Sequence, residues 1–354
     1  MPTFGFGTSH HGRPGASGRI AEAPGRDSTD SRRCRLARFI IMRLIRIAVS
    51  IIVVSMITFA LLQAAPGNFA DIQRVASGAT GMSPSQSAEV IGEIRQRYDP
   101  DLPAWQQYLN FMKGAVVWDF GPSQGYPNLT VQSIIARAFP VTVVLAAVSV
   151  AIAVLISVPL GVLTAVKQNT WIDYVSMFIF TVGRAVPNYL VALFLILLFA
   201  RELRWLPTRG WGSIEEAILP IFALTIGSIA LLSRYVRSSM IDTLRQDYIM
   251  TVRAKGGNTN AVVVKHALRN SMIPFVTVVG PYLAGLMTGT VFIESIFGIP
   301  GLGGYFADAA RTRDMPLLMG STIFFALILM GTNLLVDIIY RILDPRIAFE
   351  SGRK

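Results

Sequence analysis

The polar stretch IDTLRQDYIMTVRAKGGNTNAVVVKHALRNSMIP, residues 241–274, lies between strongly apolar segments and decides how the rest of the chain is interpreted. Its first half carries apolar side chains at helical spacing, at Ile241, Leu244, Tyr248 and Val252. Such a stripe is typical of an amphipathic helix that packs along one face. We therefore predict a helix here, held against the face of a membrane.

A double glycine interrupts this helix. Gly256-Gly257 breaks the pattern, and Asn258 offers a capping side chain for a second helical run over residues 261–272. The sequence therefore predicts a helix, a tight turn and a second helix that leads to Pro274. Charge runs are usually solvated surfaces, whereas an exposed loop with a defined shape usually carries function, and both interpretations apply to this segment.

Composition indicates a membrane protein. The chain has 354 residues, of which 52% are hydrophobic and 15% charged, and its mean hydropathy is +0.51. Soluble domains carry about 25% charged residues. The single cysteine, Cys34, excludes an internal disulfide and a cysteine cluster for zinc or iron–sulfur binding. The net charge of +11 is better explained by loop orientation in a membrane than by nucleic acid, which we do not expect as a partner.

Six apolar segments are long enough to cross a bilayer. The expected spans are residues 47–65, 138–166, 171–200, 217–233, 273–293 and 315–336. Arg184 and Pro187-Asn188 interrupt the third span, and the fourth is short. The predicted fold is therefore an all-α polytopic membrane protein with six transmembrane helices and a helical insert after the first.

The expected organisation follows from these spans. It comprises a disordered head (1–34), a first transmembrane segment (35–66), an insert (67–137), a core (138–347) that contains the loop 234–272, and a tail (348–354). The head is rich in Gly, Ser, Pro and Arg without an apolar period. The insert is expected to hold helices over residues 85–98 and 102–117, and to be either a structural cap or a docking surface for an external partner.

Lys and Arg are concentrated in the head, in the loop 234–272 and in the tail. Cytoplasmic loops of membrane proteins carry an excess of these residues. We therefore expect both termini and this loop to face the cytoplasm, and the insert and the Gly-rich loop 294–314 to face outside.

The chain lacks the usual catalytic and nucleotide-binding patterns. It contains no P-loop pattern GxxxxGK followed by Ser or Thr, no HExxH and no GxSxG. His10-His11 has no further ligands nearby, and His266 is expected to make a surface or capping contact. We expect no catalytic residues and no metal site, so energy for any transport must come from another chain or an ion gradient.

Charged groups at membrane depth are costly and mark pathways or partners. Arg184 either snorkels from the end of a tilted helix or lines a cavity where it meets a carboxylate, and Glu294 is a candidate partner for an amino terminus. The candidate translocation pathway therefore comprises Arg184, Asn188, Tyr282 and Glu294.

The sequences of several segments resemble those of the dipeptide and oligopeptide branch of the type I ABC importer permeases. DYIMTVRAKG at residues 247–256, HALRN at 266–270 and the Ile-Pro at 273–274 are similar to the cytoplasmic "EAA" loop of that branch. The resemblance extends from about Leu36 to Ile347 and includes YDPDLPAWQQYL, VPNYLVALFLILLFA, LPTRGW, ESIFGIPGLGGY and NLLVDIIYRILDPRI. The literal Glu-Ala-Ala is absent, and residues 250–252 occupy its place.

This resemblance implies a multi-pass plasma-membrane permease that imports dipeptides or oligopeptides by alternating access. It implies a second six-span permease, two cytoplasmic ATPase subunits that bind ATP and Mg, and an external solute-binding protein, while this chain binds no cofactor itself. It also implies that a coupling helix contacts an ATPase subunit. The residues that it assigns to this contact are Asp247, Tyr248, Arg253, Ala254, Lys255, Gly256, Gly257, His266, Arg269 and Asn270.

Other functions stay open. Relatives of this branch carry nickel chelates, glutathione or haem as well as peptides, and the sequence does not distinguish among them. A proton-coupled secondary transporter would want acidic residues in its spans, and residues 47–65, 138–166 and 315–336 contain none. A membrane enzyme would need a set of catalytic residues, and the sequence patterns above do not include one.

Overall fold

The computed structural model describes residues 28–64, 92, 102–126 and 128–343, and the chain divides into two compact units, residues 1–46 and 47–354. Helix α1 (Ser28–Ala64) passes from the first unit into the second. The described elements that follow are α4 (Ala104–Val116), α5 (Val131–Val166), α6 (Trp171–Ala185), α7 (Asn188–Leu195), the π-helix η1 (Ile196–Glu202), α8 (Ile214–Leu244), α9 (Asp247–Ala254), α10 (Thr259–Ala261), the π-helix η2 (Val262–Leu268), α11 (Arg269–Gly289), α12 (Val291–Phe297), α13 (Leu302–Thr312) and α14 (Met315–Leu343).

The prediction of an all-helical membrane protein is confirmed for the described residues, where the extended pairing consists of an isolated bridge between Pro122 and Thr130. In the described part of the chain, five helices are long and apolar enough to cross a membrane, and the count becomes six if the bent pair of α6 with α7 and η1 forms one span. The six predicted segments therefore correspond to helices of the structure.

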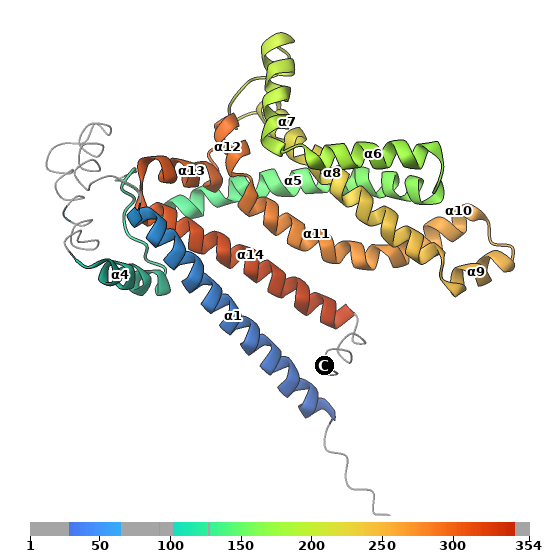
Figure 1. The fold of residues 1–354 in the computed structure, drawn as a ribbon, viewed down its shortest axis with the longest axis horizontal. Helices are drawn as coiled ribbons and strands as arrows, with labels where there is room; N and C mark the ends of the chain where they lie inside the picture. The colour runs from blue at the N-terminus through green and yellow to red at the C-terminus, as the bar shows by residue number, and fades with distance from the viewer. Residues whose placement is uncertain (1–27, 65–91, 93–101, 127, 344–354) are drawn as a thin grey trace, which may run out of the picture. The chain divides into compact units, whose positions relative to one another are not determined.

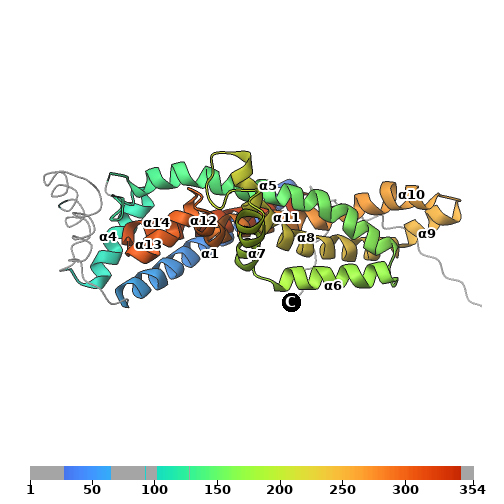
Figure 2. The same ribbon diagram turned by 90° about the horizontal axis from the view of Figure 1, so that it is seen from above.

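The closest helix pairing is that of α5 with α8, which run side by side in both views of the fold (Figures 1 and 2). Gly161 of α5 lies directly against α8, where an added Cβ would come within 2.5 Å of Val236 Cβ and 2.9 Å of Ser233 O. Small residues let membrane helices approach this closely. Thr130 begins α5 by accepting a hydrogen bond from Ser133 N, so this helix starts seven residues before the predicted span at Ala138.

The third span is bent rather than straight. Helix α6 and the α7–η1 segment meet at 94°, with the break at Val186-Pro187. Proline disfavours helical backbone in the residue before it, and Val186 accordingly has ψ 121°. The predicted interruption at Pro187-Asn188 is therefore confirmed, and it produces a sharp corner that the sequence pattern did not predict.

The fourth span is longer than predicted. Residues 217–233 were expected to cross the membrane alone, yet α8 continues without interruption to Leu244. In the charged part of this helix, Arg237 pairs with Asp173 of α6, through Nε to Oδ1 and Nη2 to Oδ2, both at 2.7 Å. Asp173 is 2% exposed. This bidentate pair ties the beginning of α6 to α8 and removes the reason to treat residues 234–244 as a loop.

The described part of the insert packs on the ends of α1 and α14. Helix α4 confirms the second predicted helix of the insert, and Tyr108 approaches Ser55 of α1 with 2.9 Å between their hydroxyl oxygens. Asp314, which is buried just before α14, accepts hydrogen bonds from Ser123 Oγ, Gly125 N and Leu317 N. Burial raises the pKa of the Asp314 carboxyl above its usual value.

The structure describes only part of the predicted head and insert, and none of the predicted tail. The predicted disordered head is wrong for residues 28–34, because α1 begins at Ser28 and these residues are helical. Residues 1–27, the first predicted helix of the insert apart from position 92, and the tail 348–354 lie outside the described residues.

Candidate functional site

The segment 247–270 lies at one end of the bundle, and α4 and α13 lie at the other (Figures 1 and 2). The predicted order of helix, turn and helix is confirmed by α9, the glycine turn and the continuous α10–η2–α11 rod. The predicted single stripe from Ile241 to Val252 is wrong in one respect. Helix α8 ends at Leu244 and α9 begins at Asp247, so the four apolar residues belong to two helices.

Helix α9 is anchored by one buried side chain and one hydrogen bond. Ile249 is fully buried against a cluster that includes Val262 and Ala267. Tyr248 Oη accepts a 2.8 Å hydrogen bond from Asn270 Nδ2. A helix of eight residues has little stability by itself, so these tertiary contacts fix its position on the following rod.

The glycine turn has the geometry that the sequence predicts. Gly256 has φ +81°, a conformation that residues with a Cβ rarely adopt. A Cβ on Gly257 would lie 2.9 Å from both Val252 Cγ1 and Val252 O, so the turn is tight on the side of α9. Asn258 caps the next helix, its Oδ1 accepting a hydrogen bond from Asn260 N.

Most of the residues assigned to this segment are exposed. Asp247, Tyr248, Arg253, Ala254, Lys255, Gly256, Gly257, Arg269 and Asn270 are exposed, and His266 in η2 is half-buried. Within the described ranges, no ion pair involves the cations of this segment. Its charged surface is therefore available to another molecule.

Sequence reasoning did not single out two exposed apolar side chains of this segment. Met250 of α9 is 59% exposed and Val264 of η2 is 61% exposed. Their neighbours in the chain, Ile249 and Val263, are buried. The helical period would have separated the two faces of α9 only if the break at Gln246 had been predicted as well as the one at Gly256.

Three of the four predicted pathway residues meet at one cavity, which we call the Arg184 cavity. It has a volume of about 470 Å³ and lies where the bend between α6 and α7 faces α8 and α11. Its walls include Arg184, Asn188, Gly227, Tyr282 and Gly285. Arg184 and Tyr282 are 98 positions apart in the chain. The bend in the third span brings them and Asn188 to the same cavity.

The wall of the Arg184 cavity is ordered by close contacts. Tyr282 Oη donates a 2.8 Å hydrogen bond to Ser228 Oγ, which itself donates to Leu224 O. Asn188 lies so close to α8 that a Cβ on Gly227 would be 2.6 Å from Asn188 Oδ1. A side chain at position 227 would therefore have to displace the side chain of Asn188.

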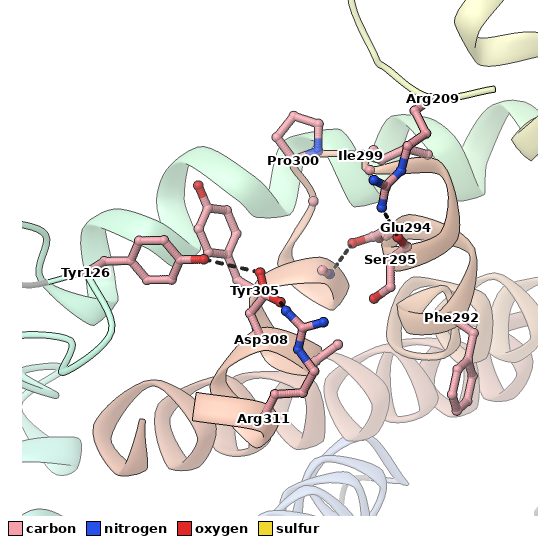
Figure 3. Close-up of a pocket in the computed structure, with 14 residues that line it drawn as sticks. Tyr126, Arg209, Phe292, Glu294, Ser295, Ile299, Pro300, Tyr305, Asp308 and Arg311 are labelled. Atoms are coloured by element: carbon pink, nitrogen blue, oxygen red, sulfur yellow. Dashed lines mark hydrogen bonds and ion pairs between the residues drawn. The ribbon is translucent and has the colours of Figure 1, made fainter. Parts of the chain in front are cut away.

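Glu294, the fourth predicted pathway residue, does not line this cavity. It lies in α12 and is completely buried, where it accepts hydrogen bonds from Thr142 Oγ1 and Thr290 Oγ1. It also accepts one from Gly304 N (Figure 3). Its carboxylate joins α5, α12 and α13. Glu294 is thus buried and hydrogen-bonded inside the protein, and its predicted role in the pathway stays a prediction.

Comparison with known proteins finds matches along most of the chain. A profile of the family described as "Binding-protein-dependent transport system inner membrane component" matches residues 157–349. A second profile, for the N-terminal part of such membrane components, matches residues 36–146. Together the two matched ranges include all or part of every predicted span.

Curated relatives match at nearly their full length. The dipeptide transport system permease protein DppB of Bacillus subtilis is 38% identical over 312 residues, which are 88% of this chain and 98% of that protein. The oligopeptide transport system permease protein OppB of Haemophilus influenzae is 35% identical over 316 residues, 89% of this chain and 100% of that protein. A chain of the MetNI methionine ABC transporter in an inward-facing conformation superimposes with a TM-score of 0.48 at 18% identity, over 60% of this chain and 96% of that chain.

Proposed function

The chain belongs to the family of binding-protein-dependent transport system inner membrane components, and within it we propose that the chain is the permease subunit of an ATP-driven importer of dipeptides or oligopeptides. The observation that carries this proposal is the identity of 38% with a dipeptide permease over 98% of that protein. Nickel chelates, glutathione and haem are less favoured, because the matching relatives are named for dipeptides and oligopeptides.

The segment 247–270 is the proposed contact with an ATPase subunit. Helix α9 presents an exposed surface of charged and apolar side chains, including Met250, at an end of the bundle, while Ile249 and the Tyr248–Asn270 bond attach it to η2 and α11. A push on α9 would therefore displace α11 and, through the short link at Arg245-Gln246, α8.

Helices α8 and α11 connect α9 directly to the Arg184 cavity and could transmit this displacement. Helix α8 runs unbroken from Gly227 in the cavity wall to Leu244 beside α9, a distance of about 26 Å at the rise of an α-helix. Helix α11 likewise runs from Asn270 to Tyr282 and Gly285 of the cavity. In the proposed mechanism, ATP-driven movement of α9 changes the shape of this cavity, which alternately opens to either side of the membrane.

The full importer would contain further chains. We infer a second six-span permease, two ATPase subunits that bind ATP and Mg, and an external binding protein that delivers the peptide. Purification of the tagged chain from cell membranes tests this composition. Recovery of ATPase and a second permease in stoichiometric amounts supports it, and purification of the chain alone under mild detergent conditions argues against it.

Exchanging Gly227 for alanine tests the role of the Arg184 cavity. The new methyl group would displace the Asn188 side chain, and overpacking of this kind costs about 1–3 kcal/mol. We expect peptide uptake to fall roughly fivefold or more at unchanged membrane level. Gly285→Ala is the matched control, because Gly285 lines the same cavity and has open space beside it. Normal uptake by Gly227→Ala would place the pathway elsewhere.

A pair of single cysteines tests the proposed orientation, in which both termini and α9 are cytoplasmic. Val116 of the insert is 82% exposed, and Val264 near α9 is 61% exposed. In a Cys34→Ser background, we expect Val116→Cys to react with a membrane-impermeant maleimide in intact cells whose outer barrier admits the reagent. Val264→Cys should react only after lysis, and the opposite pattern would reverse the orientation.

A further inference from the structure

A second cavity lies between α12, α13 and the loop before α8, and we call it the Arg209 cavity. Its volume is about 530 Å³, and Tyr126, Arg209, Ser295, Tyr305, Asp308 and Arg311 are among its lining residues (Figure 3). Pockets of about 300–1,000 Å³ hold small molecules. The cavity is larger than a single inserted side chain requires, and none of the residues of the segment 247–270 or of the Arg184 cavity lines it.

The charged groups of this cavity differ in how many hydrogen bonds and ion pairs they already make inside the protein. Asp308 accepts hydrogen bonds on both oxygens, from Tyr126 Oη at 3.2 Å and from Arg311 Nη2 at 2.8 Å. Burial and the Asp308 charge raise the pKa of Tyr126 to about 12, so the phenol keeps its proton and remains a donor. Asp308 and Arg311 thus form an ion pair at the exposed edge of the cavity.

Glu294 also borders the cavity, but a ligand cannot touch its carboxylate. The residue is completely buried, and its oxygens accept three internal hydrogen bonds. Arg209 points towards the side of the cavity on which Glu294 lies (Figure 3). The anions of the cavity are therefore either paired or enclosed.

Arg209 is the charged group left available. In the described part of the chain it has no carboxylate partner, and its single hydrogen bond, from Nη2 to Ser295 O, is long at 3.4 Å. The guanidinium lies close to Gly298, where an added Cβ would be at an ordinary van der Waals distance of 3.5 Å from Arg209 Nε.

Ser295 also lines the cavity, but its side chain is not a second donor for a ligand. Ser295 Oγ is buried and has no hydrogen-bond partner among the described residues. Because this hydroxyl is buried, a ligand in the cavity cannot touch it, as with the carboxylate of Glu294. Arg209 therefore offers its guanidinium to an anionic group, and the rings of Tyr305 and Phe292 offer apolar surface to the rest of a ligand.

We propose that the Arg209 cavity binds the terminal carboxylate of a peptide at the external end of the permease, before the peptide reaches the Arg184 cavity. This proposal rests on the proposed function and orientation. Guanidinium groups bind carboxylates through charge-assisted hydrogen bonds, often two at once. An acidic side chain of the binding protein offers the same chemistry, but the cavity volume favours a small ligand.

Ligand-observed NMR on the complex in nanodiscs, without binding protein, tests the proposal. Saturation transfer measures weak binding of the probes Ala-Phe and Ala-Phe amide, of which the amide lacks the carboxylate. We expect saturable binding of Ala-Phe by the wild-type complex and about tenfold weaker binding of the amide. Arg209→Gln should weaken binding of Ala-Phe by a similar factor. Arg204→Gln is the control, since Arg204 is exposed in the same loop and does not line the cavity.

Several results would overturn the proposal. They are no saturable binding by the wild type, equal binding of acid and amide, or wild-type binding by Arg209→Gln. If Arg209→Gln weakens association of the binding protein but not of Ala-Phe, the carboxylate comes from the binding protein and the peptide site is wrong. Uptake of labelled Ala-Phe by the complete wild-type importer separates this failure from failure of the proposed function.

Discussion

Replacing Gly256 with valine is expected to lower peptide uptake about tenfold while the permease still folds and inserts. Gly256 has φ +81°, and a left-handed conformation costs a residue with a Cβ about 1–2 kcal/mol. Nothing lies within 4 Å of the new Cβ, so the strain is relieved by turning α9 relative to η2 rather than by unfolding the bundle. The ATPase contact would then be misplaced, and we expect ATPase subunits to dissociate or to hydrolyse ATP without uptake.

The measurement is ATPase co-purification together with ATP hydrolysis stimulated by the binding protein. Gly256→Asn is the matched control, because asparagine tolerates the left-handed conformation and should retain most of the uptake. Gly257→Ala should impair coupling for a different reason, since its Cβ would collide with Val252 O. Wild-type hydrolysis and uptake in Gly256→Val would mean that the segment 247–270 is a solvated connection.

Replacing Glu294 with alanine is expected to destabilise the folded permease by roughly 3–5 kcal/mol. The change leaves three donors without an acceptor inside the protein, those of Thr142, Thr290 and Gly304. Each buried group left unsatisfied costs about 1–3 kcal/mol. Because these groups come from α5, α12 and α13, we expect the junction of these helices to loosen as a unit.

Thermal unfolding of the purified protein in nanodiscs measures this effect, and the midpoint should fall by several degrees. Glu202→Ala is the control, since Glu202 is an exposed glutamate of η1. If Glu294→Ala unfolds at the wild-type temperature and instead loses peptide uptake, Glu294 acts in the pathway and its structural role is wrong.

The spans and the family could be predicted from the sequence because both depend on local sequence patterns. Long apolar runs determine which segments cross the membrane, and the profile matches confirm the predicted family. The glycine turn was equally accessible, because Gly256 and the Asn258 cap are local features with few conformational alternatives. The exact break between α8 and α9 was missed, since no glycine or proline marks Gln246.

Features that depend on a distant partner could not be predicted. The ion pair of Arg237 in α8 needs Asp173, which is 64 positions away in the chain. The burial of Glu294 requires Thr142 of α5, 152 positions away. In both cases a charged side chain suggested solvent or substrate, whereas the structure supplies an internal partner.

Three residues of the Arg184 cavity, in contrast, were grouped correctly from the sequence. Arg184, Asn188 and Tyr282 were grouped because polar groups within spans are costly, and the structure brings them to one cavity. The sequence did not show the 94° bend that creates this cavity, nor Gly227, which makes room for Asn188. Their role in the pathway stays a prediction, which the Gly227→Ala experiment tests.

Uptake of labelled Ala-Phe and Ala-Ala-Phe into proteoliposomes tests the central claim most directly. The vesicles would contain this chain, its partner permease and the ATPase subunits, with the binding protein and ATP supplied on their respective sides. We predict accumulation of at least one peptide that requires ATP, the binding protein and this chain together. Accumulation that persists without ATP, or without this chain, would contradict the account, as would ATP hydrolysis coupled to neither peptide.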